Sequence, residues 1–135
     1  MKPVLVDTGF LIALYRPSDP DHAASWSYLR EHRHPLATVV PVIVETCFFL
    51  SPLSKVTFLS WIRQGAVSVV EVPTGAYAQL EVTLRKYADH DIDFADAALV
   101  WLANETGARG ILTADRGDFE LFRLKGSRRF HLIDW

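Results

Sequence analysis

The feature that most constrains the fold of this chain is a set of short, mainly apolar segments separated by longer stretches with helical periodicity. An apolar run of about four to eight residues is typical of a strand that is buried on both faces of a sheet. The run at residues 3–7 has this form, and further strands are predicted at residues 36–39, 67–72, 110–113 and 130–133. Strands that are connected through helices run parallel, because the chain must cross back over the sheet between them. We therefore predict an α/β fold: a single domain over residues 1–135, built as a three-layer α/β/α sandwich with a five-stranded parallel sheet.

Helices are predicted between these runs from apolar spacing and from start and stop signals. They cover residues 10–15, 20–32, 41–50, 55–64, 74–87 and 94–105. Thr74 is expected to cap the fifth of them, and Tyr77, Leu80, Leu84 and Tyr87 are expected to share its inward face.

Composition indicates a folded domain in a reducing compartment. Half of the residues are apolar, and Trp61, Trp101 and the phenylalanines at helical spacing are assigned to the core or to an interface. Cys47 is the single cysteine and cannot form an intramolecular disulfide, which fits a cytoplasmic protein. No signal peptide or membrane span is expected, because Asp7 and Glu45 interrupt the longest apolar stretches. The net charge of −2 argues against a strongly basic nucleic-acid binder.

Three carboxylates stand alone in segments that are otherwise uncharged. Asp7 is the only charged residue between positions 3 and 15, Glu45 between 36 and 54, and Asp96 between 94 and 104. An unpaired buried carboxylate is costly unless it takes up a proton. Structural alternatives exist for each, because Asp7 and Asp96 could stabilise helix starts and Glu45 could pair with an arginine or lie on an exposed stripe.

One shared location explains these carboxylates together. In an open parallel sheet, ligands bind beyond the carboxyl ends of the strands, where the strand order switches. Asp7 ends the first predicted strand, Asp115 follows the fourth, and the helices that carry Glu45 and Asp96 reach the same edge. Oxygen ligands without His or Cys favour Mg²⁺ or Mn²⁺ over Zn²⁺, and such clusters are typical of phosphoryl chemistry. If four of the 16 acidic residues bind metal, 12 remain, and the 14 basic residues outnumber them.

The motifs around these carboxylates resemble those of the PIN-domain family, which includes the VapC toxins of bacterial and archaeal toxin–antitoxin pairs. The motifs are Val4-Leu-Val-Asp7-Thr-Gly-Phe-Leu-Ile-Ala-Leu14, Pro41-Val-Ile-Val-Glu45-Thr, Asp93-Phe-Ala-Asp96-Ala-Ala-Leu and Ile111-Leu-Thr-Ala-Asp115-Arg-Gly-Asp118-Phe. They span nearly the whole chain in the family's order and spacing. The resemblance implies a five-stranded parallel sheet between helices and a metal-dependent endoribonuclease, the toxin of a type II toxin–antitoxin pair.

The resemblance also implies roles for individual residues. The catalytic and metal-binding carboxylates would be Asp7, Glu45, Asp96 and Asp115, with Mg²⁺ or Mn²⁺ as the cofactor. Supporting positions would be Thr8, Thr113, Asp118 and Asp93, although helix capping is the main role expected of Asp93. Hydrolysis would leave 5′-phosphate and 3′-hydroxyl ends. The expected partners are an RNA substrate, a small antitoxin protein and a second copy of the chain, with no membrane involved.

Basic residues near the end of the chain are candidates for contact with the RNA backbone. On the basis of charge, the candidates for this contact are Arg116, Arg123, Lys125, Arg128 and Arg129. A solvated surface without function is the alternative for such a run.

Two other functional classes share some of these features. Asp7-Thr8-Gly9 after an apolar run is also the tripeptide of retroviral-type aspartic peptidases, which act as homodimers, but their all-β fold conflicts with the helical patterns. A catalytically silent metal- or RNA-binding module, such as a receiver domain, would also gather acids at a sheet edge. A receiver needs an acceptor aspartate after its third strand and a lysine after its fifth, and this sequence offers neither.

Overall fold

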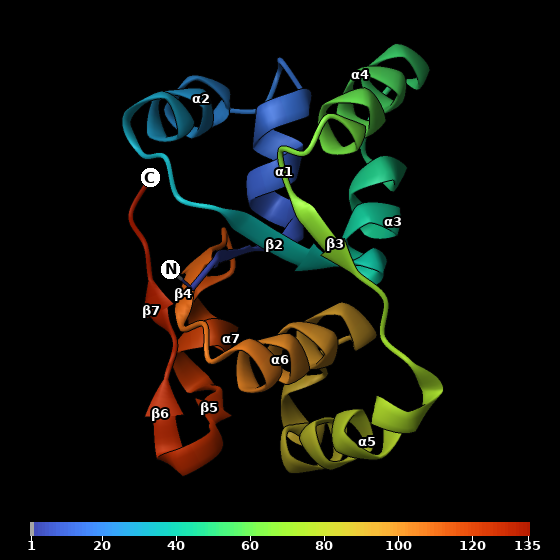
Figure 1. Ribbon diagram of the computed structural model, residues 1–135, viewed down its shortest axis with the longest axis vertical. Helices are drawn as coiled ribbons and strands as arrows, with labels where there is room; N and C mark the ends of the chain where they lie inside the picture. The colour runs from blue at the N-terminus through green and yellow to red at the C-terminus, as the bar shows by residue number, and fades with distance from the viewer. Residues whose placement is uncertain (1) are drawn as a thin grey trace.

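The sheet at the centre of the molecule contains parallel strands only. A computed structural model describes residues 2–135 (Figure 1). Its main sheet has the strand order β3-β2-β1-β4-β7, and each neighbouring pair is parallel. The strands are β1 (Val4–Val6), β2 (Leu36–Val39), β3 (Ser68–Val70), β4 (Gly110–Leu112) and β7 (His131–Leu132). The predicted five-stranded parallel sheet is confirmed.

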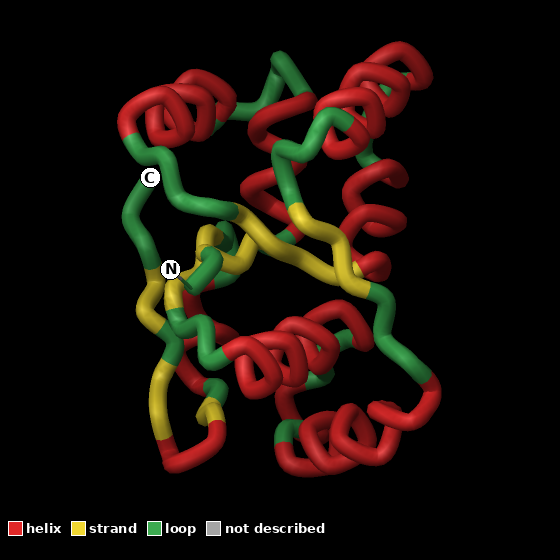
Figure 2. Tube along the Cα trace, in the orientation of Figure 1, coloured by secondary structure: helices red, strands yellow, loops and turns green. Residues whose placement is uncertain are grey.

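Helices cover both faces of this sheet, as Figures 1 and 2 show. One layer contains α1 (Thr8–Tyr15), α2 (His22–Glu31), α3 (Val40–Phe48) and α4 (Pro52–Arg63). The other contains α5 (Tyr77–Lys86), α6 (Phe94–Thr106) and α7 (Arg116–Leu121). The predicted three-layer α/β/α architecture is therefore confirmed as well.

The central strands are buried on both faces, which explains why their sequences are uninterrupted apolar runs. Leu5 and Val6 in β1, and Ile111 and Leu112 in β4, have no exposed surface. Full burial of one such side chain contributes about 1.5–3 kcal/mol. Helix α6 is buried over most of its circumference, because it lies between the sheet and α5.

The long apolar stretch of residues 36–53 is divided among β2, α3 and the start of α4. Within residues 2–135, no helix combines the length and the apolar character that crossing a membrane requires.

Two short elements near the C-terminus were not predicted from the sequence. Helix α7 has six residues and includes Gly117, so it is too short to show a helical period. The basic run forms a hairpin of β5 (Arg123–Leu124) and β6 (Arg128–Arg129), the only antiparallel pair in the described chain. Gly126 adopts a positive φ of 73° in its turn, a conformation that glycine tolerates without strain.

The start of α5 also differs from the prediction. Residues Thr74–Ala76 form a separate 3₁₀ turn, and α5 begins only at Tyr77. Leu80 is buried as expected, but Tyr77 is 43% exposed. Tyr77 lies in the first turn of the helix, where it packs against Phe94 instead of the sheet.

Candidate active site

The strand order switches between β1 and β4. From β1, the chain adds β2 and β3 on one side and β4 and β7 on the other. Asp7 directly follows β1 and Thr113 directly follows β4, so both lie at the switch point where ligands bind in open parallel sheets. A cavity of about 460 Å³ lies at this edge. Its acidic lining residues are Asp7, Glu45, Asp93, Asp96 and Asp115.

Asp7 is buried and is held by a hydroxyl from the neighbouring strand end. Its Oδ2 accepts a hydrogen bond of 2.8 Å from Oγ1 of Thr113. Asp7 occupies the N-cap position of α1, but its side chain forms no capping bond, so capping does not account for it. Burial raises the pKa of Asp7 to about 6, and the nearby charges of Glu45 and Asp93 act in the same direction. The backbone N–H of Thr8 and the hydroxyl of Thr113 oppose that shift without cancelling it.

Glu45 reaches the cavity from the second turn of α3. Its Oε1 accepts a hydrogen bond of 2.7 Å from Oγ1 of Thr8. Glu45 forms no salt bridge with an arginine of residues 2–135, so the ion-pair alternative does not apply. Burial raises the pKa of Glu45, and the carboxylate of Asp93 raises it further.

Asp93 and Asp96 form a reciprocal capping box at the start of α6. The backbone N–H of Asp96 donates to Oδ1 of Asp93 at 2.9 Å, and the backbone N–H of Asp93 donates to Oδ2 of Asp96 at 3.2 Å. The capping role expected of Asp93 is confirmed. Burial raises the pKa of Asp96 to about 8, with added repulsion from Asp93 and Asp7. Asp93 therefore caps the helix and also lines the carboxylate cavity.

Asp115 lies at the exposed rim of the cavity. Its Oδ1 accepts a bond of 3.2 Å from the backbone N–H of Asp118 and so caps α7. Its own N–H donates to Oγ1 of Thr113 at 2.9 Å. Asp118 is not among the residues that line the cavity; it interacts with the Asp115 carboxyl group. Partial burial raises the pKa of Asp118, and the interaction of its side chain with that of Asp115 and the charge of Asp115 act in the same direction.

Gly9 allows the loop that carries Asp115 to approach α1 closely. A Cβ atom on Gly9 would lie 2.6 Å from Cβ of Ala114, closer than two carbon atoms can pack. This close approach is a structural reason for glycine at position 9 of an α/β fold. The aspartic-peptidase alternative is wrong, because the observed fold is not the all-β fold that it requires.

The donor set suits a hard divalent cation. The cavity contains carboxylate and hydroxyl oxygens, and none of the described residues that line it is Lys, Arg or His. Across residues 2–135, no three His, Cys, Asp or Glu side chains are already assembled as a metal-ligand cluster. Since burial raises the pKa of Asp7, Glu45 and Asp96, a positive charge in the cavity would stabilise their ionised forms.

The basic residues nominated from the sequence do not gather around this cavity. Lys125 and Arg128 line a different cavity beside Asn104, near the C-terminal end of α6. Asp96 lies in the first turn of the same 13-residue helix, which is about 20 Å long. Arg129 is exposed on β6 of the same hairpin.

Two of the nominated arginines have partners within the chain. The guanidinium group of Arg123 donates to the backbone oxygens of Glu120, Leu121 and Phe122, so it closes the end of α7. Arg116 forms a salt bridge of 3.4 Å with Asp134. It directly follows Asp115, so among these basic residues it is the nearest to a carboxylate of the site in sequence.

Comparisons with known proteins agree with this architecture. The profile of the PIN domain matches residues 4–123. Ribonuclease VapC26 of Mycobacterium tuberculosis is 32% identical over 134 residues, which cover 96% of this chain and 99% of that protein. The crystal structure of M. tuberculosis VapC20, described as a sarcin–ricin loop cleaving toxin, superposes with a TM-score of 0.73. That match covers 83% of this chain and 91% of VapC20 at 22% identity, so it concerns the fold.

Proposed function

Since the chain belongs to the PIN-domain family, we propose that it is an endoribonuclease that hydrolyses RNA phosphodiester bonds with Mg²⁺ or Mn²⁺, and that it is the toxin of a type II toxin–antitoxin pair. The observation that carries the proposal is the meeting of Asp7, Glu45, Asp96 and Asp115 at one cavity at the switch point of the sheet. The ribonuclease named among its relatives, VapC26, supports RNA as the substrate.

Asp7, Glu45, Asp96 and Asp115 are the residues that would hold the cation. When bound, Mg²⁺ or Mn²⁺ would lower the pKa of a water molecule and neutralise charge on the scissile phosphate. The hydroxyl groups of Thr113 and Thr8 orient Asp7 and Glu45, so these carboxylates are held in place before substrate arrives. The capping box positions Asp96 in the same way.

The acidic lining also indicates how RNA would bind. A phosphate that approaches the cavity meets five carboxylates and no basic side chain among the described lining residues. Binding of the scissile phosphate is therefore expected to depend on the cation. Arg116, which directly follows Asp115 in the sequence, could add positive charge.

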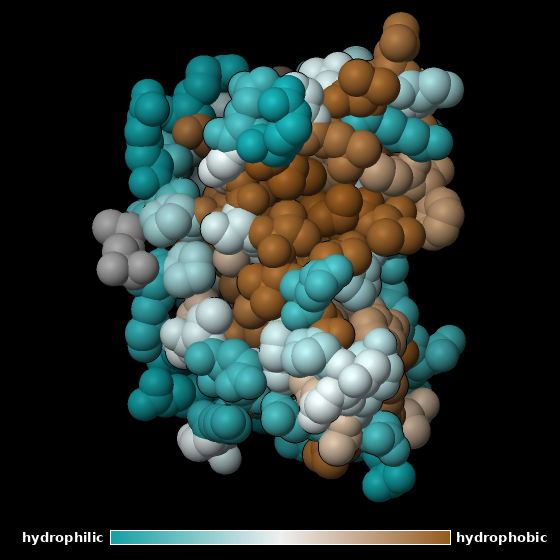
Figure 3. All heavy atoms as spheres, turned by 45° about the vertical axis from the view of Figure 1, so that its right-hand side comes forward, coloured by the Kyte–Doolittle hydropathy of each residue, from teal (hydrophilic) through white to brown (hydrophobic). Residues whose placement is uncertain are grey.

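A second copy of the chain is the partner that we propose for an exposed apolar surface on α3 and α4. This α3–α4 surface consists of Val44, Phe48, Phe49, Leu53, Val56 and Leu59, which are 49–81% exposed. Figure 3 shows hydrophobic residues gathered over this side of the molecule. Exposed patches of this kind mark protein interaction sites. Phe49 also lines the carboxylate cavity, so a partner on this surface would border the site. A small antitoxin is a second expected partner, and the cytoplasmic location stays a prediction.

The test is to incubate the purified protein with total cellular RNA and Mg²⁺ or Mn²⁺, beside an EDTA control and the Asp96→Asn variant. Asparagine keeps an oxygen that can accept the N–H of Asp93, so α6 should remain capped. Glu105→Gln makes the same chemical change at an exposed site on the far end of α6 and should cleave normally. Cleavage in EDTA, or full cleavage by Asp96→Asn, would contradict the proposal.

A further inference from the structure

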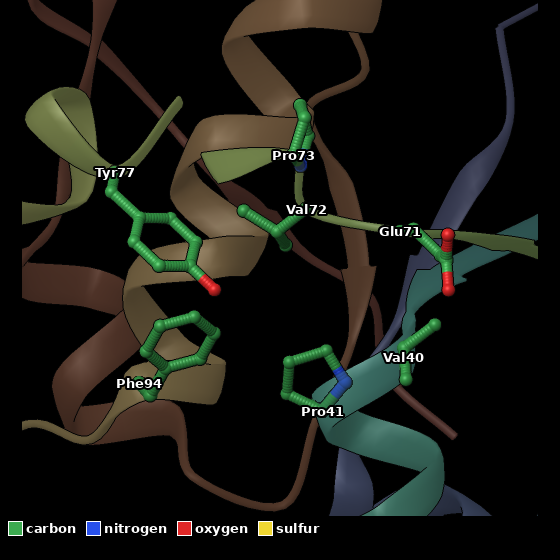
Figure 4. Close-up of a pocket in the computed structure, with 7 residues that line it drawn as sticks. All are labelled: Val40, Pro41, Glu71, Val72, Pro73, Tyr77 and Phe94. Atoms are coloured by element: carbon green, nitrogen blue, oxygen red, sulfur yellow. The ribbon is translucent and has the colours of Figure 1, made fainter. Parts of the chain in front are cut away.

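A second cavity, of about 400 Å³, lies next to the carboxylate cavity and has no role in the proposed hydrolysis. Figure 4 shows Tyr77 and Phe94 together on one side of it, with Pro41 and Glu71 on the other and Val72 between. Its volume lies within the range of sites that bind small organic groups, roughly 300–1,000 Å³.

The aromatic pair leaves much of its surface uncovered. Tyr77 is 43% exposed and Phe94 is 41% exposed, although both are large apolar side chains. Their rings pack edge to face, with centroids 5.8 Å apart and an interplanar angle of 84°. Exposed aromatic rings at a cavity wall are suited to stacking with planar ligands, above all with unpaired nucleobases.

Helix α3 and the start of α6 contribute walls to both cavities. Phe94 directly follows Asp93, which lines the carboxylate cavity. Pro41 precedes Glu45 by four positions in α3, so the two lie on one helix face about 6 Å apart along the axis. A group bound against Phe94 would therefore neighbour a phosphate bound by the carboxylates.

The charge of the lining favours a base over a phosphate. Glu71 is the one charged residue among the described residues of this cavity, and it forms no salt bridge within residues 2–135. A carboxylate repels phosphate but accepts hydrogen bonds from the N–H groups of base edges. Guanine presents two adjacent N–H groups that match the two oxygens of one carboxylate.

From this geometry we propose that the cavity formed by Tyr77, Phe94, Pro41 and Glu71 binds one unpaired nucleobase of the RNA substrate, adjacent to the scissile phosphate, with guanine preferred. The ring stacks on the aromatic pair, and the N–H edge donates to Glu71. This inference rests on the proposed ribonuclease function and adds a base-specific subsite to it.

The test measures RNA binding separately from cleavage. The full chain carrying Asp96→Asn is titrated, with Mg²⁺ present, with labelled uridine oligonucleotides that contain a single guanosine, adenosine or cytidine. Adding Phe94→Leu, which keeps apolar volume but removes the ring, should weaken binding roughly tenfold, and Phe94→Tyr should restore it. Glu71→Gln should remove the preference for guanosine, whereas the matched change Glu81→Gln, at an exposed site on α5, should leave that preference intact.

Unchanged affinity in Phe94→Leu, or an unchanged base preference in Glu71→Gln, would overturn the subsite. A change of oligomeric state in Phe94→Leu, measured by sedimentation, would also overturn it and assign the cavity to a protein interface. Cleavage of total RNA by the wild type separates the two proposals: if the wild type cuts RNA and Phe94→Leu binds normally, only the subsite fails. If the wild type neither binds nor cuts RNA, both proposals fail.

Discussion

The hydroxyl group of Thr113 donates a hydrogen bond of 2.8 Å to Oδ2 of Asp7, although the two residues are 106 positions apart in the chain. The bond joins the end of β4 to the end of β1 at the point where the strand order switches. The same oxygen of Thr113 accepts the backbone N–H of Asp115. One buried hydroxyl thus links the Asp7 carboxylate to the backbone of Asp115, and we propose both residues as metal ligands.

Replacing Thr113 with valine should weaken catalysis without unfolding the protein. Valine has the same shape but cannot hold the Asp7 carboxylate, and loss of such a supporting contact typically costs about 10–100-fold in metal affinity or activity. The measurement is the Mg²⁺ concentration that gives half-maximal RNA cleavage, which should rise. Thr113→Ser retains the hydroxyl and should behave almost as the wild type; equal metal requirements in Thr113→Val and the wild type would refute the role.

The metal-free protein should lose stability as the pH rises from about 4 to 8. Burial raises the pKa of Asp7 from 3.8 to about 6 and that of Asp96 from 3.8 to about 8, so in this range the folded state binds more protons than the unfolded state. The free energy of unfolding then falls with increasing pH. Thermal unfolding in EDTA should show a decreasing Tm, and Mg²⁺ should restore it at neutral and higher pH.

The Asp96→Asn variant supplies the control for this pH dependence. Without the Asp96 carboxyl group, the decrease in Tm between about pH 6 and 8 should largely disappear, because the group responsible is absent. A Tm that rises over this range in metal-free wild type would show that the carboxylates are not destabilised by burial.

A methyl group on Gly9 should disturb the loop that carries Asp115. The added Cβ would lie 2.6 Å from Cβ of Ala114, and overpacking of this kind costs about 1–3 kcal/mol. Urea denaturation should show the loss of stability, and RNA cleavage should decrease because Asp115 moves. Gly117→Ala is the matched control, since nothing lies within 4 Å of a Cβ there; equal effects at both positions would exclude the close approach as the cause.

Polar substitutions on the α3–α4 surface should weaken self-association. Phe48 is 78% exposed and Leu53 is 81% exposed, so Phe48→Ser and Leu53→Ser should leave the Tm of the monomer nearly unchanged. Loss of a buried apolar contact of about 1.4 kcal/mol would weaken the dimer roughly tenfold, measured by sedimentation equilibrium. Val82→Ser removes a 62% exposed apolar side chain from α5 and should not alter association. A wild type that is monomeric at all concentrations would contradict the proposed homodimer.

Arg123 should prove to be a structural residue. Its guanidinium group donates to three backbone oxygens at the end of α7, and Arg123→Gln should lower the free energy of unfolding by about 1–3 kcal/mol. RNA affinity should change little, because Nη1 of the guanidinium group is already engaged by the backbone at the end of α7. Arg128→Gln, at an exposed site in the same hairpin, should leave stability unchanged. If Arg123→Gln lost much of its RNA affinity while its stability stayed unchanged, Arg123 would be an RNA-binding residue and not a structural one.

The central strands and the isolated carboxylates could be recognised from the sequence because both signals are local. Leu5 and Ile111 belong to uninterrupted apolar runs, which report burial on both faces. Asp7 and Asp96 stand out because burial of a charge is unfavourable unless something compensates it. Helix α7 and the β5–β6 hairpin gave no comparable signal, since elements of two to six residues are too short to show a period.

By itself, the sequence determined the five strands of the parallel sheet, the longer helices between them and the set of acids that could form a site. Only the tertiary structure decided that Asp93 faces the same cavity as Glu45, that the basic hairpin lies at the opposite end of α6, and that Tyr77 and Phe94 form an exposed pair. The physical reason is that periodicity describes how one segment divides between core and solvent. Which segment ends become neighbours depends on packing between elements that are distant in the chain, and no single segment records that packing.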